Sequence, residues 1–118
     1  MNSKYKTDLS ERSFELSVRI IETYRKCPKN DTTRIIANQI IRSSTSIGAN
    51  IVEAKASSSR KEFKKFNEIA LRSANESIYW LRLSRKVDLI TKPDYDKLCD
   101  EVEQLCKMLA SGIKKLKN

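Results

Sequence analysis

Apolar side chains recur every three or four residues over four long stretches of the chain, which is the spacing of an amphipathic α-helix. This spacing predicts helices over residues 9–25, 32–56, 60–85 and 93–116. The most regular stripe belongs to the last helix and consists of Tyr95, Leu98, Val102, Leu105, Leu109, Ile113 and Leu116. No stretch alternates apolar and polar residues for long enough to predict a β-strand.

The first predicted helix carries two apolar sets, both with helical spacing. Phe14, Val18 and Ile21 form one set, and the apolar face is widened by Leu16, Ile20 and Tyr24. We expect Asp8 or Ser10 to cap this helix. The third predicted helix begins with a capping-box pattern, in which the Ser59 hydroxyl accepts from the amide of Glu62 and the Glu62 side chain reaches back. Thr91 is expected to cap the last helix.

Residues 42–50, in the middle of the second predicted helix, are poor helix formers and include Gly48. Two interpretations compete. The helix either breaks here into a polar loop, or it continues and its small side chains let a neighbouring helix approach closely. Isoleucines at positions 40, 47 and 51 keep the helical period across this stretch, so we favour a continuous helix.

Four amphipathic helices with short connections predict an all-α fold, an antiparallel up-down-up-down four-helix bundle. The chain of 118 residues is expected to form a single domain over residues 1–118. Only two Gly and two Pro occur, which argues against a turn-rich sandwich or barrel.

Two linked motifs resemble the four-helix-bundle proteins that are encoded in bacterial 23S rRNA intervening sequences. The first motif runs from Ile41 to Glu53, and the second comprises Lys61, Glu62, Phe63, Phe66, Ile69, Ala70, Ser73 and Glu76. The resemblance covers roughly residues 9–116. The family usually has Gly where this chain has Ala54, often Pro where it has Gly48, and frequently a small residue where it has Arg72.

The resemblance implies a bacterial protein that assembles into a ring of five four-helix subunits, a homopentamer. The same family includes accessory proteins of diversity-generating retroelements, which associate with a reverse transcriptase and with RNA. Some members carry a ribosomal-protein label. A reverse transcriptase and a nucleic acid are therefore partners that the resemblance suggests.

The composition offers little for catalysis. The chain has no His, so a Ser or Cys nucleophile lacks its usual base and a metal lacks its commonest ligand. Glu53, Glu62, Glu68 and Glu76 do not form a di-iron site of the usual kind, because that site needs Glu-x-x-His pairs. We therefore expect no enzyme activity, no metal and no cofactor.

The three cysteines, Cys27, Cys99 and Cys106, form no C-x-x-C pair and are expected to fill the core. Their use fits a reducing cytoplasm. The longest apolar run is only four residues (78–81), so we expect no contact with the membrane interior and a cytoplasmic location.

Positive charge is the strongest remaining signal. The formal net charge is +9, and residues 59–90 carry eight basic and four acidic side chains. The densest group is expected to bind the phosphates of RNA or DNA without sequence preference, and consists of Lys55, Arg60, Lys61, Lys64 and Lys65, with Arg42 and Arg72 adjoining.

Two further expectations concern the same helices. A structural polar network across the second and third helices is expected to contain Asn50, Glu53, Ser73 and Glu76, with Arg42 or Arg72 as the charge partner. Some apolar side chains exceed the needs of one core, namely Ile35, Ile41, Ile69, Tyr79 and Trp80. This surplus favours an alternative role as an assembly or adaptor protein, which contacts other subunits or a protein such as a reverse transcriptase.

Overall fold

The computed structural model describes residues 8–116. These residues form four α-helices, which are α2 (Leu9–Arg25), α3 (Asp31–Ala56), α4 (Arg60–Lys86) and α5 (Lys92–Leu116). The helix bounds differ by at most one residue from the ranges that the apolar spacing predicts. None of these four helices is long and apolar enough to cross a membrane.

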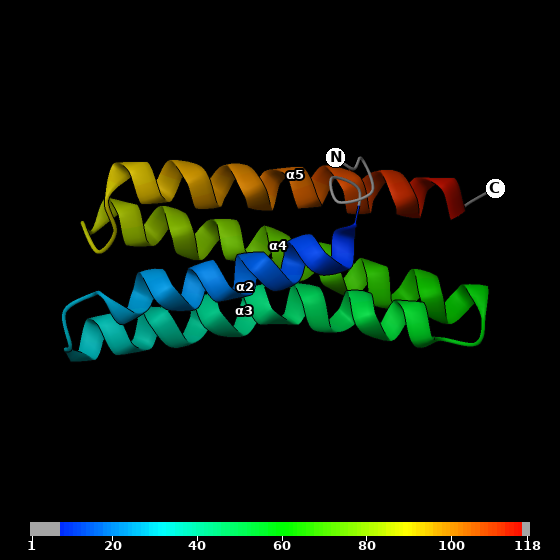
Figure 1. Ribbon diagram of the computed structural model, residues 1–118, viewed down its shortest axis with the longest axis horizontal. Helices are drawn as coiled ribbons and strands as arrows, with labels where there is room; N and C mark the ends of the chain where they lie inside the picture. Colours follow the sequence, from blue (N-terminus) through cyan, green and yellow to red (C-terminus); the bar gives the residue numbers. More distant parts are fainter. Residues whose placement is uncertain (1–7, 117–118) are drawn as a thin grey trace.

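The helices run antiparallel to their neighbours in the chain (Figure 1). Each helix packs against the next one, and α2 also packs against α5. The prediction of an all-α fold with four packed helices is therefore confirmed, and residues 8–116 contain no strand.

Each helix begins at a side chain that accepts a hydrogen bond from an otherwise unpaired backbone amide. The four capping side chains are Asp8, Asn30, Ser59 and Thr91. Asp8, and not Ser10, caps α2. The expected capping box is formed in part. Ser59 Oγ accepts from the Glu62 amide at 3.1 Å, but the Glu62 carboxylate accepts from the amide of Ser58 at 3.4 Å.

Helix α3 is continuous from Asp31 to Ala56, so the interpretation as a continuous helix is confirmed and a polar loop is excluded. The small side chains let two neighbours approach. A Cβ atom on Gly48 would lie 3.1 Å from Ser13 Oγ of α2, which leaves no room for a side chain without a shift. On the side of α4, Ser43 is fully buried and its hydroxyl is 2.8 Å from that of Ser77.

Helix α2 buries a different stripe from the one that Phe14, Val18 and Ile21 suggested. Its buried side chains are Ser13, Leu16, Ile20 and Tyr24. Phe14 is 62% exposed, and Val18 and Ile21 are only partly buried. At 3.6 residues per turn the two sets lie roughly a third of a turn apart. Helix α2 buries the set with Leu16, Ile20 and Tyr24 because these side chains face the other helices. Tyr24 also forms a 2.7 Å hydrogen bond with Ser84 of α4.

A bidentate ion pair ties α2 to α5. Arg12 Nε donates to Glu101 Oε2 at 3.0 Å, and a terminal nitrogen donates to Glu101 Oε1 at 2.9 Å. Both side chains are only about one-fifth exposed. The hydrogen bond to Glu101 raises the pKa of Arg12. The pair therefore fixes the register of the shortest helix against the last one.

The buried Tyr24 makes stability depend on alkaline pH. Burial raises the pKa of Tyr24 from 10.0 to about 12, against the smaller opposing effect of its hydrogen bond with Ser84. The neutral phenol is favoured in the folded state. Its contribution to the free energy of unfolding is therefore complete below pH 10.0 and is lost as the pH rises towards 12.

We predict that the wild-type chain loses roughly 2 kcal/mol of unfolding free energy between these pH values relative to Tyr24→Phe, which has no phenol to ionise. Urea denaturation of both proteins at a series of alkaline pH values measures the difference. Two parallel pH profiles would contradict the prediction.

Candidate nucleic-acid interface

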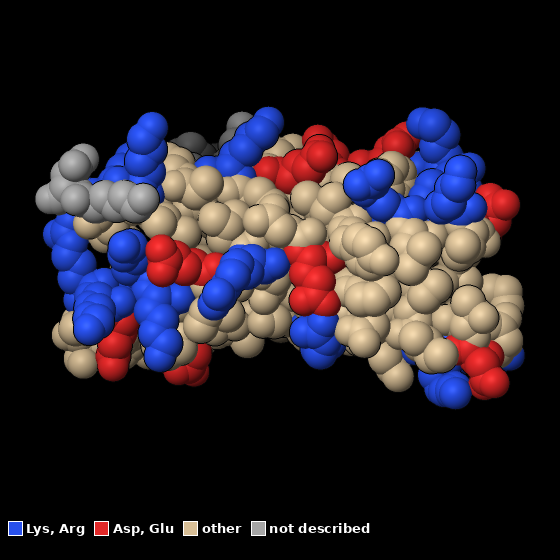
Figure 2. Space-filling view, turned by 180° about the vertical axis from the view of Figure 1, so that it is seen from behind, with Lys and Arg blue, Asp and Glu red and all other residues tan. Residues whose placement is uncertain are grey.

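Five basic side chains meet at the end of the bundle where α3 connects to α4. Lys55 lies in the last turn of α3, and the first two turns of α4 carry Arg60, Lys61, Lys64 and Lys65. We call these five residues the basic cluster. Figure 2 shows basic side chains gathered over this end of the molecule, at the left of the view. All of them are exposed except Lys64, which is partly buried.

Local structure brings the cluster together. Helix α3 ends at Ala56 and is capped by Ser57, whose hydroxyl donates to the carbonyl oxygen of Ala54 at 2.6 Å, and the N-cap Ser59 of α4 follows two residues later. Arg60 and Lys61 then stand at a helix N-terminus, where the helix dipole is already positive and cations are unfavourable. Their charges add to the positive field of the helix terminus, and this field favours the binding of an anion.

The members of the basic cluster differ in their partners. Lys64 lies 4.0 Å from the Glu68 carboxylate, and Arg60 donates to the Leu116 carbonyl oxygen of α5 at 3.2 Å. Lys65 lies over the ring of Phe66, 5.4 Å from its centre. Within residues 8–116, Lys55, Lys61 and Lys65 have no acidic group at salt-bridge distance. These three ammonium groups keep their full charge available to a ligand.

The two adjoining arginines lie near the middle of the bundle. Arg72 is twelve residues beyond Arg60, which corresponds to about 18 Å along the helix axis. Because Lys61, Lys65 and Arg72 recur at intervals of four and seven residues, they share one face of α4. Arg72 is exposed and has no ion-pair partner among the described residues. It therefore extends the surface of the basic cluster along α4.

Arg42 is placed differently. Its guanidinium forms an ion pair with the Glu76 carboxylate of α4, and it donates to Gln39 Oε1 at 3.0 Å and 3.3 Å. The same Glu76 carboxylate accepts from Trp80 Nε1 at 2.8 Å. The structure thus assigns Arg42 to contacts between α3 and α4, and its charge is already compensated.

The expected polar network lies between these helices, with one exception. Ser73 Oγ donates to Ser46 Oγ of α3 at 2.9 Å, and Asn50 joins them by donating to the same Ser46 hydroxyl at 3.0 Å. Glu76 connects to α3 through Arg42. Glu53 is exposed and forms no hydrogen bond with α4 in the described part of the chain, so it lies outside the network.

Several contributing residues were not indicated by the sequence. Ser43, Ser46 and Ser77 are the partners that complete the hydroxyl pairs between α3 and α4. The signal for Ser43 and Ser46 was the run of small residues in α3, and nothing in the sequence pointed to Ser77 of α4. Arg82, Lys86 and Tyr95 line a groove at the other end of the bundle, and nothing in the spacing of charges pointed to it.

The cysteine thiols are held in their neutral form. Burial raises the pKa of Cys27, Cys99 and Cys106. A thiol with a raised pKa is a poor nucleophile and a poor metal ligand at neutral pH. None of these three thiols is therefore an activated nucleophile.

Comparisons with known proteins agree on one family. The family model described as 23S rRNA-intervening sequence protein matches residues 6–111. A solved structure of a protein of unknown function from the S23 ribosomal protein family of Bacteroides thetaiotaomicron VPI-5482 is similar to this chain, with 38% sequence identity and a TM-score of 0.84. The match covers 90% of this chain and 95% of that one. No curated protein matches the chain.

Proposed function

The chain belongs to the 23S rRNA-intervening sequence protein family, and on this premise we propose that it is a non-enzymatic protein that binds RNA or DNA. The basic cluster contacts the phosphates and does not read the base sequence. One observation carries this proposal: five basic side chains meet at one end of the bundle, and four of them have no acidic partner within residues 8–116.

Long-range electrostatics favour phosphate binding at this end. A phosphate that meets a lysine displaces condensed counterions, which makes the affinity fall steeply with salt. The unpaired lysines supply this effect without losing an existing ion pair, because their charges are not compensated in the free protein. The positive end of the α4 dipole adds to their field.

Lys61→Glu/Lys65→Glu is the variant that tests this proposal, because both side chains are exposed and lie one turn apart on α4. We predict that it lowers duplex RNA or DNA affinity at low salt by at least about tenfold. The slope of log affinity against log salt concentration should become shallower by about 2, one for each lost phosphate contact. Fluorescence anisotropy with a labelled duplex at several salt concentrations measures both quantities.

The matched control is Lys26→Glu/Lys97→Glu, which changes two exposed lysines at the other end of the bundle and gives the same net charge. It should bind the duplex almost as the wild-type protein does. Equal losses in the two variants, or wild-type binding that does not respond to salt, would refute the basic cluster as the binding surface.

A second candidate function, self-association, is favoured by apolar surface. Phe14, Ile35, Val52 and Val87 are each at least half exposed. Phe14 and Val52 line a groove of 590 Å³ between α2 and α3, together with Val18, Ile21 and Ala49. Exposed apolar surface of this kind marks contacts with other proteins. We propose that a second copy of the chain occupies the groove.

The arrangement of the apolar residues favours a ring. Ile35 is seventeen residues from Val52, about 25 Å along α3, and lies on a different side of that helix. Two unlike surfaces produce head-to-tail contacts, which close into rings when the rotation permits. The homopentamer implied by the family resemblance is one such ring. A different protein, such as a reverse transcriptase, is the alternative occupant.

Val52→Lys tests self-association, because it places a charge in the groove at a residue that is already 53% exposed in the free chain. We predict that the wild-type chain is oligomeric at micromolar concentration and that Val52→Lys shifts it towards monomers with unchanged helix content. Light scattering and circular dichroism measure the two quantities. Ala110→Lys, at an exposed position of α5, is the control and should stay oligomeric. A monomeric wild-type chain would contradict self-association.

A further inference from the structure

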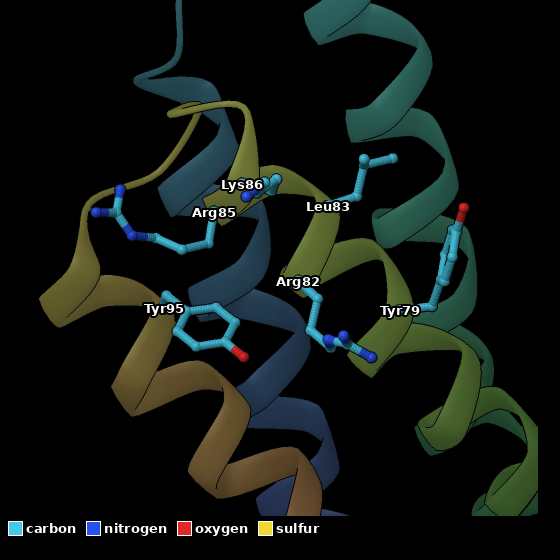
Figure 3. A pocket seen from close by; sticks show the side chains of 6 residues that line it. All are labelled: Tyr79, Arg82, Leu83, Arg85, Lys86 and Tyr95. Atoms are coloured by element: carbon cyan, nitrogen blue, oxygen red, sulfur yellow. The ribbon is translucent and has the colours of Figure 1, made fainter.

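A groove with a different chemistry lies at the opposite end of the bundle from the basic cluster. It has a volume of 540 Å³ and is lined by Tyr79, Arg82, Leu83, Arg85, Lys86 and Tyr95. We call it the tyrosine groove. Its residues come from the last two turns of α4 and the beginning of α5 (Figure 3). None of the six lining side chains is acidic.

Two of its three cations are available to a ligand. Arg82 and Lys86 are exposed, and neither forms an ion pair with any described residue. Arg85 is already occupied, because its guanidinium donates to Asp88 Oδ1 at 3.2 Å and to the carbonyl oxygen of Ile90 at 3.1 Å. Arg85 therefore holds the α4–α5 connection in place, while Arg82 and Lys86 provide the positive field of the groove.

Arg82 lies between two aromatic rings. In Figure 3 its side chain extends into the space between Tyr79 of α4 and Tyr95 of α5. Its charge acts on the Tyr95 phenol, where it opposes the rise in the pKa of Tyr95 that a hydrogen bond to Cys99 produces. The Arg82 guanidinium is therefore close to the Tyr95 ring, which lines the groove.

The Tyr79 ring is exposed and held in position. Tyr79 is 57% exposed, and its ring packs edge-to-face with Trp80 at a centre-to-centre distance of 4.9 Å. Trp80 is itself fixed by its 2.8 Å hydrogen bond to Glu76. An aromatic ring that is exposed yet oriented in advance gives a flat partner a surface on which to stack, at a small cost in side-chain entropy.

We propose that the tyrosine groove binds an unpaired nucleotide of a nucleic-acid strand, with its base stacked on Tyr79 and its phosphates at Arg82 and Lys86. Aromatic rings interleaved with cations are the usual means of holding single strands without sequence preference. A base inside a duplex is stacked on its neighbours and cannot present its face to Tyr79. The inference rests on the proposed function for the class of its ligand, and it adds a second site that selects unpaired bases.

Three proteins and two ligands test this site. The ligands are a labelled single-stranded oligonucleotide and an abasic strand with the same number of phosphates, and the proteins are wild type, Tyr79→Ala and Tyr79→Phe. We expect the wild type to prefer the base-bearing strand. Tyr79→Ala should weaken binding of that strand about tenfold and leave the abasic strand unaffected, because one stacked base is lost. Tyr79→Phe keeps the ring and should retain the preference.

The cations are tested in parallel. Arg82→Gln should weaken both strands by a similar factor, and the control Arg25→Gln, an exposed arginine at the same end of the bundle, should weaken neither by as much. Circular dichroism checks that each variant is folded. The inference is overturned if wild type binds the two strands equally well, if Tyr79→Ala keeps the preference for bases, or if Tyr79→Phe loses it.

Failure of this inference is distinguishable from failure of the proposed function. The basic cluster is judged by duplex binding and by its response to charge reversal at Lys61 and Lys65, neither of which involves base stacking. The tyrosine groove is judged by the difference between base-bearing and abasic strands, which does not involve those lysines.

Discussion

The hydroxyl pairs between α3 and α4 determine the rest of the structure. Ser43 pairs with Ser77, and Ser46 pairs with Ser73, at 2.8 Å and 2.9 Å. Both pairs form together at one register of the antiparallel helices, and a shift by one turn would lose both of these hydrogen bonds between α3 and α4, at about 1 kcal/mol each. This register sets Lys55 at the end of α3 beside the start of α4, and it aligns Arg42 with Glu76. The turn between the Ser57 and Ser59 caps brings the basic cluster together, and the register of α3 and α4 is compatible with this turn.

Features that depend on one helix alone could be predicted from the sequence, and features that depend on two could be predicted only in part. The repeated spacing of apolar residues predicted the four helices, and the isoleucines at positions 40, 47 and 51 predicted that α3 continues across Gly48. The buried face of α2 was ambiguous because both apolar sets have the same period, and only packing against Gly48 and Ser84 selects one. Arg42 was expected both as a charge partner in the polar network and as a phosphate-binding residue, and its ion pair with Glu76 decides between these roles. The assembly of the tyrosine groove likewise depends on which residues of different helices face each other.

The two ends of the bundle carry different chemistry, and the α2–α3 groove lies along one side of it. Lysines with uncompensated charge dominate the α3–α4 end, whereas the α4–α5 end combines two cations with oriented aromatic rings. The α2–α3 groove opens on a side of the bundle, away from the α4–α5 face that holds Tyr95 and Arg82. A copy that occupies this groove would lie on the side of the bundle opposite to the tyrosine groove. The family resemblance and the surface chemistry are thus compatible with one another.

The most direct test is the stability of two variants at Ser77, which is fully buried against Ser43. Chemical denaturation should show that Ser77→Ala lowers the free energy of unfolding by about 1 kcal/mol, the value of one hydrogen bond. Ser77→Leu should lower it by about 3 kcal/mol, because the larger side chain forces α3 and α4 apart. A leucine variant that is as stable as the alanine variant would show that the serines do not set the distance between these helices.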